Sequence, residues 1–204
     1  MDHAPAQTLP PPPPEAVRTI THERGLMVRQ ILSQARAGGQ SSLVERLLQA
    51  AGPGCVAQFR QTPGFFEWVP SPLALSLHEA WCDFLGLDTM AARGAEAARQ
   101  MLEGPQGWML RLASPAFILS SLPKVFPLYY RGGELQVQLR EPGHARVHLW
   151  ARGYPESWFR DALPAWVHTA LALAGAREVQ ARLVEADERS PSPDLHIYDI
   201  RWAV

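Results

Sequence analysis

The stretch AWVHTALALAGAREVQARLVEA, Ala165–Ala186, changes its periodicity at Gly175. Before this glycine the apolar residues recur at helical spacing, and after it they alternate, with Val179, Ala181 and Leu183 on one side. Glycine commonly ends a helix because it adopts a left-handed backbone without a steric penalty. The stretch therefore predicts a helix followed directly by a strand.

Strand signals flank this unit on both sides. Residues 134–140 alternate between apolar and polar side chains, as do residues 145–150, and the turn sequence EPGH lies between them. This pattern predicts a β-hairpin with one apolar face. A last strand is expected over residues 196–202, where His196, Tyr198, Ile200 and Trp202 share one side. The C-terminal half is thus predicted to be β-β-α-β-β.

The first half of the chain carries helix signals. Helices are expected from Glu15 onward, from a Ser42 cap to Gly52, over residues 71–86, and from Asp88 or Thr89 to Glu103. A fifth helix is expected from Ser114, and Pro123 and Pro127 should bend or divide it. After the first hairpin, Asp161 should cap a further helix. The expected fold class is α+β, a helical N-terminal half followed by a β-β-α-β-β antiparallel sheet with helices packed on one face.

The N-terminal segment differs from the rest of the chain. It contains five consecutive prolines, Pro10–Pro14, which favour a solvated polyproline II conformation. We expect residues 1–14 to form a disordered, proline-rich leader, and residues 15–204 to form a single α+β domain.

Removal of Met1–Pro14 is expected to leave the melting temperature nearly unchanged, because no apolar periodicity in this segment can join a core. Thermal unfolding of the full-length and shortened chains checks this. A large drop in the melting temperature would show that the proline run docks on the domain.

Composition excludes several classes of function. The net charge of −1 and pI of about 6.7 argue against a nucleic-acid partner. Lys124, the only lysine, lies in a segment without glycines, so a phosphate-binding loop is excluded. Two separate cysteines build neither a disulfide framework nor a cysteine-based zinc site. No membrane span or secretory signal is evident, so we expect a cytoplasmic protein with no membrane partner.

Three quoted segments carry a resemblance to a protein family. RTITHERGLMVRQIL, SPLALSLHEAWCDFLGLDTMAARGAEAARQMLEG and the tail WVHTALALAGAREVQARL with IYDIRW resemble a myxobacterial family of proteins about 200 residues long, a domain of unknown function. The helical first half and β-β-α-β-β second half are also similar to the fold shared by vinyl-reductase-like ligand domains, TRAPP transport subunits and haem nitric-oxide sensors. That fold implies a small-molecule pocket or a protein-docking surface, although fold alone does not give function.

The haem sensors of this fold carry a Tyr-x-Ser-x-Arg porphyrin clamp. Here YPESWFR supplies Tyr154, Ser157 and Arg160 at a different spacing. This departure argues against haem, and no cofactor is expected.

Candidate chemistry is sparse. His78 and Cys82 lie four residues apart on one face of a predicted helix, which suits two metal ligands, but nothing adjacent completes a set of three or four, so no metal is expected. An enzyme would need a site assembled from scattered residues, either these two or the histidines His144, His148, His168 and His196. A third interpretation is a helix-turn-helix regulator, whose second helix offers few base-reading side chains.

Aromatic residues are the remaining signal. One group lies on the helix that follows Ser114, and a second group, Trp150, Trp158, Phe159 and Trp166, falls within 17 positions further along the chain. They either pack between helix and sheet or line an apolar cavity or partner-facing patch. The favoured function is a non-enzymatic regulatory or sensory module that binds an apolar small molecule or a partner protein. The candidate ligand-binding residues are Phe117, Phe126, Tyr129, Tyr130, Trp150, Trp158 and Trp166.

Self-association is expected as well. Trp150, Tyr198 and Trp202 would be costly to expose if they pointed away from the helices, and a two-fold homodimer would cover them.

Overall fold

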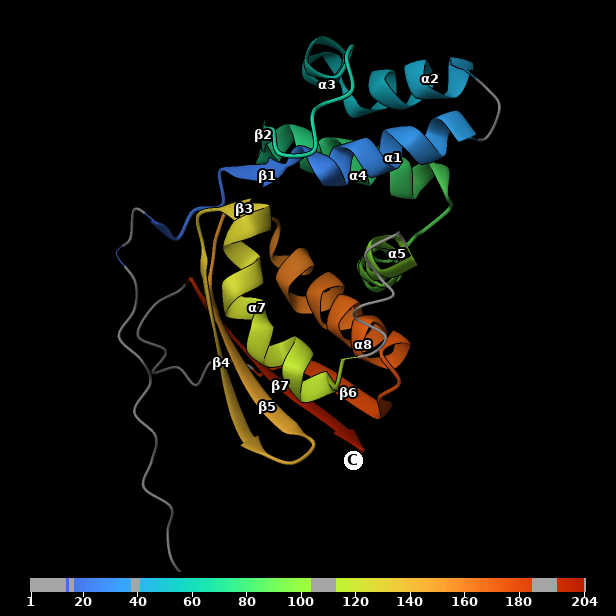
Figure 1. Ribbon diagram of the computed structural model, residues 1–204. Coiled ribbons are helices and arrows are strands. Elements are labelled where there is room, and N and C mark those ends of the chain that lie inside the picture. Colours follow the sequence, from blue (N-terminus) through green and yellow to red (C-terminus); the bar gives the residue numbers. More distant parts are fainter. Residues whose placement is uncertain (1–13, 15–16, 38–40, 104–112, 185–193, 204) are drawn as a thin grey trace, which may run out of the picture.

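The computed structural model describes residue 14 and residues 17–37, 41–103, 113–184 and 194–203 (Figure 1). All but the last residue of the expected leader therefore lies outside the described residues. In chain order the elements are β1 (His22–Arg24), α1 (Gly25–Ala37), α2 (Ser41–Ala51), α3 (Pro53–Gln58), β2 (Trp68–Pro70), α4 (Ser71–Phe84), α5 (Met90–Glu103), α7 (Pro115–Tyr129), β3 (Tyr130–Arg131), β4 (Glu134–Glu141), β5 (His144–Trp150), the π-helical turn η2 (Trp158–Ala162), α8 (Leu163–Leu173), β6 (Arg177–Val184) and β7 (Leu195–Ala203).

The main sheet is antiparallel, with the strand order β4-β5-β7-β6. Val137 pairs with Val147, Val147 with Tyr198, and Tyr198 with Leu183, so these four side chains form one row across the inner face. Helices α7 and α8 lie on this face (Figure 1). The expected α+β fold, with its β-β-α-β-β half and helices on one face, is confirmed.

Two clusters of buried apolar side chains form the interior. The sheet cluster lies between the inner face of the sheet and helices α7 and α8, and includes Leu119, Leu149, Leu171 and Ile200. The helical cluster lies among α1, α2, α3 and α4. Figure 1 shows α1–α4 at one end of the molecule, the sheet with α7 and α8 at the other, and α5 between the two groups.

Residues 18–24 are not helical, so the expected helix from Glu15 is wrong over these residues. Their backbone groups are bonded to residues far away in the chain: the N–H of Ile20 donates to the carbonyl of Arg152 at 2.9 Å, and the N–H of Thr21 donates to that of Arg131 at 2.9 Å. Strand β1 then pairs with β2 on one side and β3 on the other. These long-range partners override the local helical pattern.

Other helix limits also differ from the expected ones. The last helical segment begins as a π-helical turn at Trp158, and Asp161 lies inside that turn rather than at a cap. Helix α7 runs undivided through Pro123 and Pro127. The caps at Thr89 and Ser114 agree with expectation, since their hydroxyl oxygens accept backbone N–H groups at 3.1 and 3.3 Å.

The outward orientation expected for Tyr198 and Trp202 is wrong. Tyr198 is buried in the sheet cluster and donates its hydroxyl to the carbonyl of Phe159 at 3.0 Å, and Trp202 packs against the same cluster. Trp150 does lie on the opposite face from Val147, but it is buried too. Exposed rings therefore give no reason to expect a dimer.

Among the described helices, none is long and apolar enough to cross a bilayer.

The backbone of α5 approaches η2 closely at Gly94. A Cβ atom built on Gly94 would lie far inside the van der Waals contact distance of the Ala162 carbonyl oxygen, and the nearest neighbours it would meet are all backbone atoms. Backbone cannot move aside as the end of a side chain can, so only glycine allows this approach.

The Gly94→Ala variant is expected to be less stable than the parent by about 1–3 kcal/mol, because the added methyl group separates α5 from η2. Helix propensity alone would make this change stabilising by about 1 kcal/mol. A decrease in the free energy of unfolding would therefore be due to the close approach of the two backbones. Thermal or urea unfolding measures it. Gly54→Ala in α3 is the control, since its Cβ would meet only the end of the Leu73 side chain; equal effects of the two changes would contradict the assignment.

Candidate functional site

A cavity of about 190 Å³ lies where the two clusters meet. Its wall takes Trp81 from the helical cluster, and Val147, Leu149 and Tyr198 from the sheet cluster. Helix α5 supplies a further part of the wall, including Ala97. The cavity is thus enclosed by elements from both halves of the chain.

Most of the wall is apolar or aromatic. Of the seven aromatic residues selected from the sequence, Phe126, Tyr129, Tyr130, Trp158 and Trp166 line the cavity. The other two do not: Phe117 is 62% exposed on α7, and Trp150 is buried on the outer side of the sheet. A wall of this composition suits an apolar ligand.

The main polar group in the wall is Glu23 at the centre of β1. It pairs with Val69 of β2 and Tyr130 of β3, so its backbone is held on both sides. The residue is 2% exposed. One carboxylate oxygen, Oε1, accepts a hydrogen bond from the hydroxyl of Tyr154, and the other, Oε2, lies 3.6 Å from His78 Nε2.

Two tyrosines beside Glu23 remain protonated. Burial, together with the charge of Glu23, raises the pKa of Tyr154 and the pKa of Tyr130 far above the usual range. Both phenols can therefore donate a hydrogen bond and carry no charge at any physiological pH.

The other charged groups of the wall are mainly acidic. Glu79 and Glu96 line the cavity together with Glu23. Arg93 lines it as well, but its guanidinium is bonded to the Asp83 carboxylate and to the carbonyl of Leu87. The described part of the wall thus carries more carboxylates than cations.

Among the fully buried side-chain nitrogen and oxygen atoms of the described wall, one has no hydrogen-bond partner. This atom is the indole Nε1 of Trp81, a residue that is only 7% exposed. A buried N–H without an acceptor is unfavourable, so this indole is one of the less well satisfied polar groups beside the cavity.

His78 and Cys82 both line the cavity, but the structure does not join them in a metal site. His78 is paired with Glu23. No group of three or more His, Cys, Asp or Glu side chains that could hold a metal ion occurs among the described residues. Both cysteines are buried free thiols, and burial raises the pKa of Cys82 to about 11.

The other histidines do not converge. His144 and His148 lie on the outer face of the sheet, and His168 is exposed on α8. His196 lies on the inner side, where its ring stacks on Phe159 with a 4.0 Å separation of ring centroids. An enzymatic site built from these four residues is therefore not formed.

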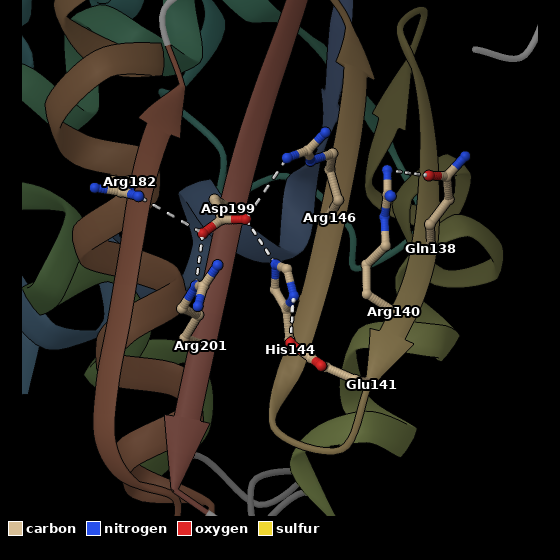
Figure 2. A network of polar contacts seen from close by, with 8 residues as sticks. All are labelled: Gln138, Arg140, Glu141, His144, Arg146, Arg182, Asp199 and Arg201. Atoms are coloured by element: carbon tan, nitrogen blue, oxygen red, sulfur yellow. Dashed lines mark hydrogen bonds and ion pairs between the residues drawn. The ribbon is translucent and has the colours of Figure 1, made fainter. Parts of the chain in front are cut away.

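His144 belongs to a polar network on the outer face of the sheet (Figure 2). Its Nε2 lies 2.7 Å from Oδ1 of Asp199, and Arg201 Nε donates to Oδ2 at 3.0 Å, while two more arginines lie 3.9 Å away. Burial alone would raise the pKa of Asp199, but the hydrogen bonds from His144 and Arg201 outweigh it, so the pKa is lowered. The network links side chains of β5, β6 and β7, and none of its residues lines the cavity.

Sequence reasoning missed the polar centre of the cavity. Glu23 lies in a stretch that matched a helical pattern, and Tyr154 was noticed only as part of an imperfect porphyrin clamp. The segment THERG, in which three polar or charged residues lie between a threonine and a glycine, gives no local sign that its glutamate is buried. Only pairing with β2 and β3 buries it.

The architecture is that of the H-NOX fold. An oxygen-binding H-NOX domain related to soluble guanylate cyclases, in its oxygen complex, has a TM-score of 0.61 at 10% identity, with 89% of this chain and 95% of that chain covered. A Cs H-NOX mutant with 4-cyano-L-phenylalanine has a TM-score of 0.61 at 11% identity, covering 89% and 97%. An H-NOX protein from S. oneidensis, in the Fe(II)NO ligation state, has a TM-score of 0.58 at 9% identity, covering 89% and 99%.

At these identities the similarity establishes the fold and leaves the ligand open. No protein-family model matches the sequence, and no curated protein is similar to it. The expected relation to the haem nitric-oxide sensor fold agrees with the structural comparison, while the myxobacterial family resemblance stays a prediction.

The Cys82 thiol is expected to react slowly in the folded protein. A thiol with a pKa of about 11 is roughly 100-fold less ionised at pH 8 than an ordinary cysteine, and the thiolate is the reactive form. Alkylation by iodoacetamide, followed by peptide mass spectrometry, measures the rate at Cys82. Urea-unfolded protein is the control and should react at the ordinary rate; fast labelling of folded Cys82 would show an activated nucleophile instead.

Proposed function

We propose that this chain is a non-enzymatic sensory or regulatory module that binds an apolar small molecule in the cavity between its two clusters. Binding there changes how the two clusters pack against each other, and a partner protein would recognise this change in structure. The observation that carries the proposal is a largely apolar cavity whose wall contains buried polar groups left incompletely bonded, Glu23 and Trp81.

Haem is bound by proteins of the H-NOX family, so its fit to this cavity is the first question. A porphyrin dicarboxylate needs donors for two negative charges. Arg93, the arginine in the described wall, is already bonded to Asp83, and Glu23 and Glu79 would repel the propionates.

The porphyrin clamp is absent as well. Tyr154 donates its hydroxyl to Glu23, and the Arg160 side chain is 59% exposed beside Asp161. The part of α7 that lines the cavity presents Leu122, Val125, Phe126 and Tyr129, without a histidine. The described residues therefore do not fit haem, and the proposed ligand is a different molecule.

An enzyme is the alternative that deserves comparison, because Glu23, His78 and Tyr154 do converge at one place in the cavity. This convergence meets the geometric condition for a site assembled from scattered residues. Binding is favoured because the wall is largely apolar and because burial raises the pKa of the Cys82 thiol, so this cysteine does not support covalent catalysis. Homodimerisation forms no part of the proposal, since Tyr198 and Trp202 lie inside.

Filling the cavity should abolish binding. The Ala97→Leu variant places a larger side chain in the wall, and it is expected to weaken the binding of a neutral apolar probe, octanol, by about tenfold or more, equivalent to about 1.4 kcal/mol. Trp81, Trp158 and Trp166 line the cavity, so a titration of tryptophan fluorescence reports occupancy.

Ala91→Leu is the matched control, because Ala91 is an exposed residue of the same helix and does not line the cavity. It should bind octanol like the parent protein. If the parent shows no saturable response to octanol, or if Ala97→Leu binds as well as Ala91→Leu, the cavity is not the binding site.

A further inference from the structure

We infer that the ligand of this cavity carries a protonated amine, which Glu23 binds, at the end of an apolar body. The inference rests on the proposed function, since it names the chemical class of the molecule for the same cavity. It follows from the position of Glu23, from its incomplete bonding and from the charge of the wall around it.

The position of Glu23 is fixed before any ligand arrives. Strand β1 is paired on both sides, and the carboxylate is held by the Tyr154 hydroxyl. A side chain that is held in place loses little conformational freedom when it binds a ligand. The carboxylate is therefore a preorganised acceptor in the wall.

The bonding of Glu23 is incomplete among the described residues. A carboxylate can accept about four hydrogen bonds. The Tyr154 hydroxyl supplies one, while His78 Nε2 lies 3.6 Å from Oε2, which is too long for a hydrogen bond. A carboxylate buried without its full set of donors is costly, so a ligand that brings further donors relieves this cost.

The surrounding charge selects the sign of the ligand. Glu79 and Glu96 share the wall with Glu23. Glu96 is ion-paired with Arg99 at 3.3 Å, as Arg93 is with Asp83, so Glu23 and Glu79 dominate the charge that a ligand meets. A carboxylate ligand would meet repulsion from Glu23 and Glu79, whereas an ammonium group would be attracted by them. The aromatic faces of the wall, Trp81 and Trp158 among them, also favour a cation over an anion.

The apolar body follows from the rest of the wall. Beyond the acidic groups, the lining is aliphatic and aromatic from both clusters. A short, heavily hydrated polyamine would leave this surface unfilled, so the expected class is a primary amine with a hydrocarbon or aromatic tail.

Three probes of equal chain length separate these contributions. Octylamine, octanol and octanoate are titrated at pH 7 into the parent protein, with calorimetry as the readout. Octylamine is expected to bind about tenfold or more tightly than octanol, and octanoate more weakly than octanol. This order in the parent protein is a test that needs no variant.

The Glu23→Gln variant then identifies the group responsible. It is expected to lose the preference for octylamine while octanol binds as before, and the octanol result also shows that the cavity is intact. Glu141→Gln is the matched control, because it removes the same charge from an exposed residue at the far end of the hairpin. It should keep the full preference.

The outcomes distinguish the inference from the proposed function. If octanol binds and octylamine shows no advantage, or if Glu23→Gln keeps that advantage, the amine assignment is overturned while the apolar site stands. If none of the three probes binds the parent protein, the proposed function itself fails.

Discussion

The pairing of strand β1 with both β2 and β3 is the interaction on which the rest of the structure depends. Three residues, His22–Arg24, connect the helical cluster to the segment that leads into the main sheet. The preceding residues extend the connection through hydrogen bonds to Arg131 and Arg152, and the Ser71 hydroxyl donates to the Ile20 carbonyl at 2.9 Å. Without these bonds the two clusters would be linked mainly through α5, and no cavity with a fixed carboxylate would exist between them.

The features of the fold that were predictable from the sequence are those with local causes. Helix α4 starts at a Ser-Pro pair, α5 follows the Thr89 cap, and the hairpin alternates around a turn, so each could be recognised from a few neighbouring residues. Strand β1 could not be recognised in this way. Its three residues are too few to show a period, and its conformation is determined by partners such as Tyr130, more than 100 positions away.

The same distinction applies to the candidate site. The aromatic candidates could be identified because aromatic residues are unusually frequent between Phe117 and Trp166, and five of the seven line the cavity. Glu23, His78 and Tyr154 come from three distant segments, and only the fold brings them together. The fold shared with H-NOX proteins likewise says little about the ligand, because the charge of the cavity wall is a property of side chains that 10% identity leaves free to change.

The shared wall of the cavity also connects ligand concentration to the lifetime of the folded chain. Trp81 belongs to one cluster and Leu149 to the other, so unfolding of either cluster removes part of the wall. A ligand at a hundred times its Kd would therefore stabilise both clusters together by about 2.7 kcal/mol. Proteases act on chains that have opened, so such a ligand would lower the open population by roughly 100-fold. The amount of intact protein in a cell would then follow the supply of its ligand, without any change in its synthesis.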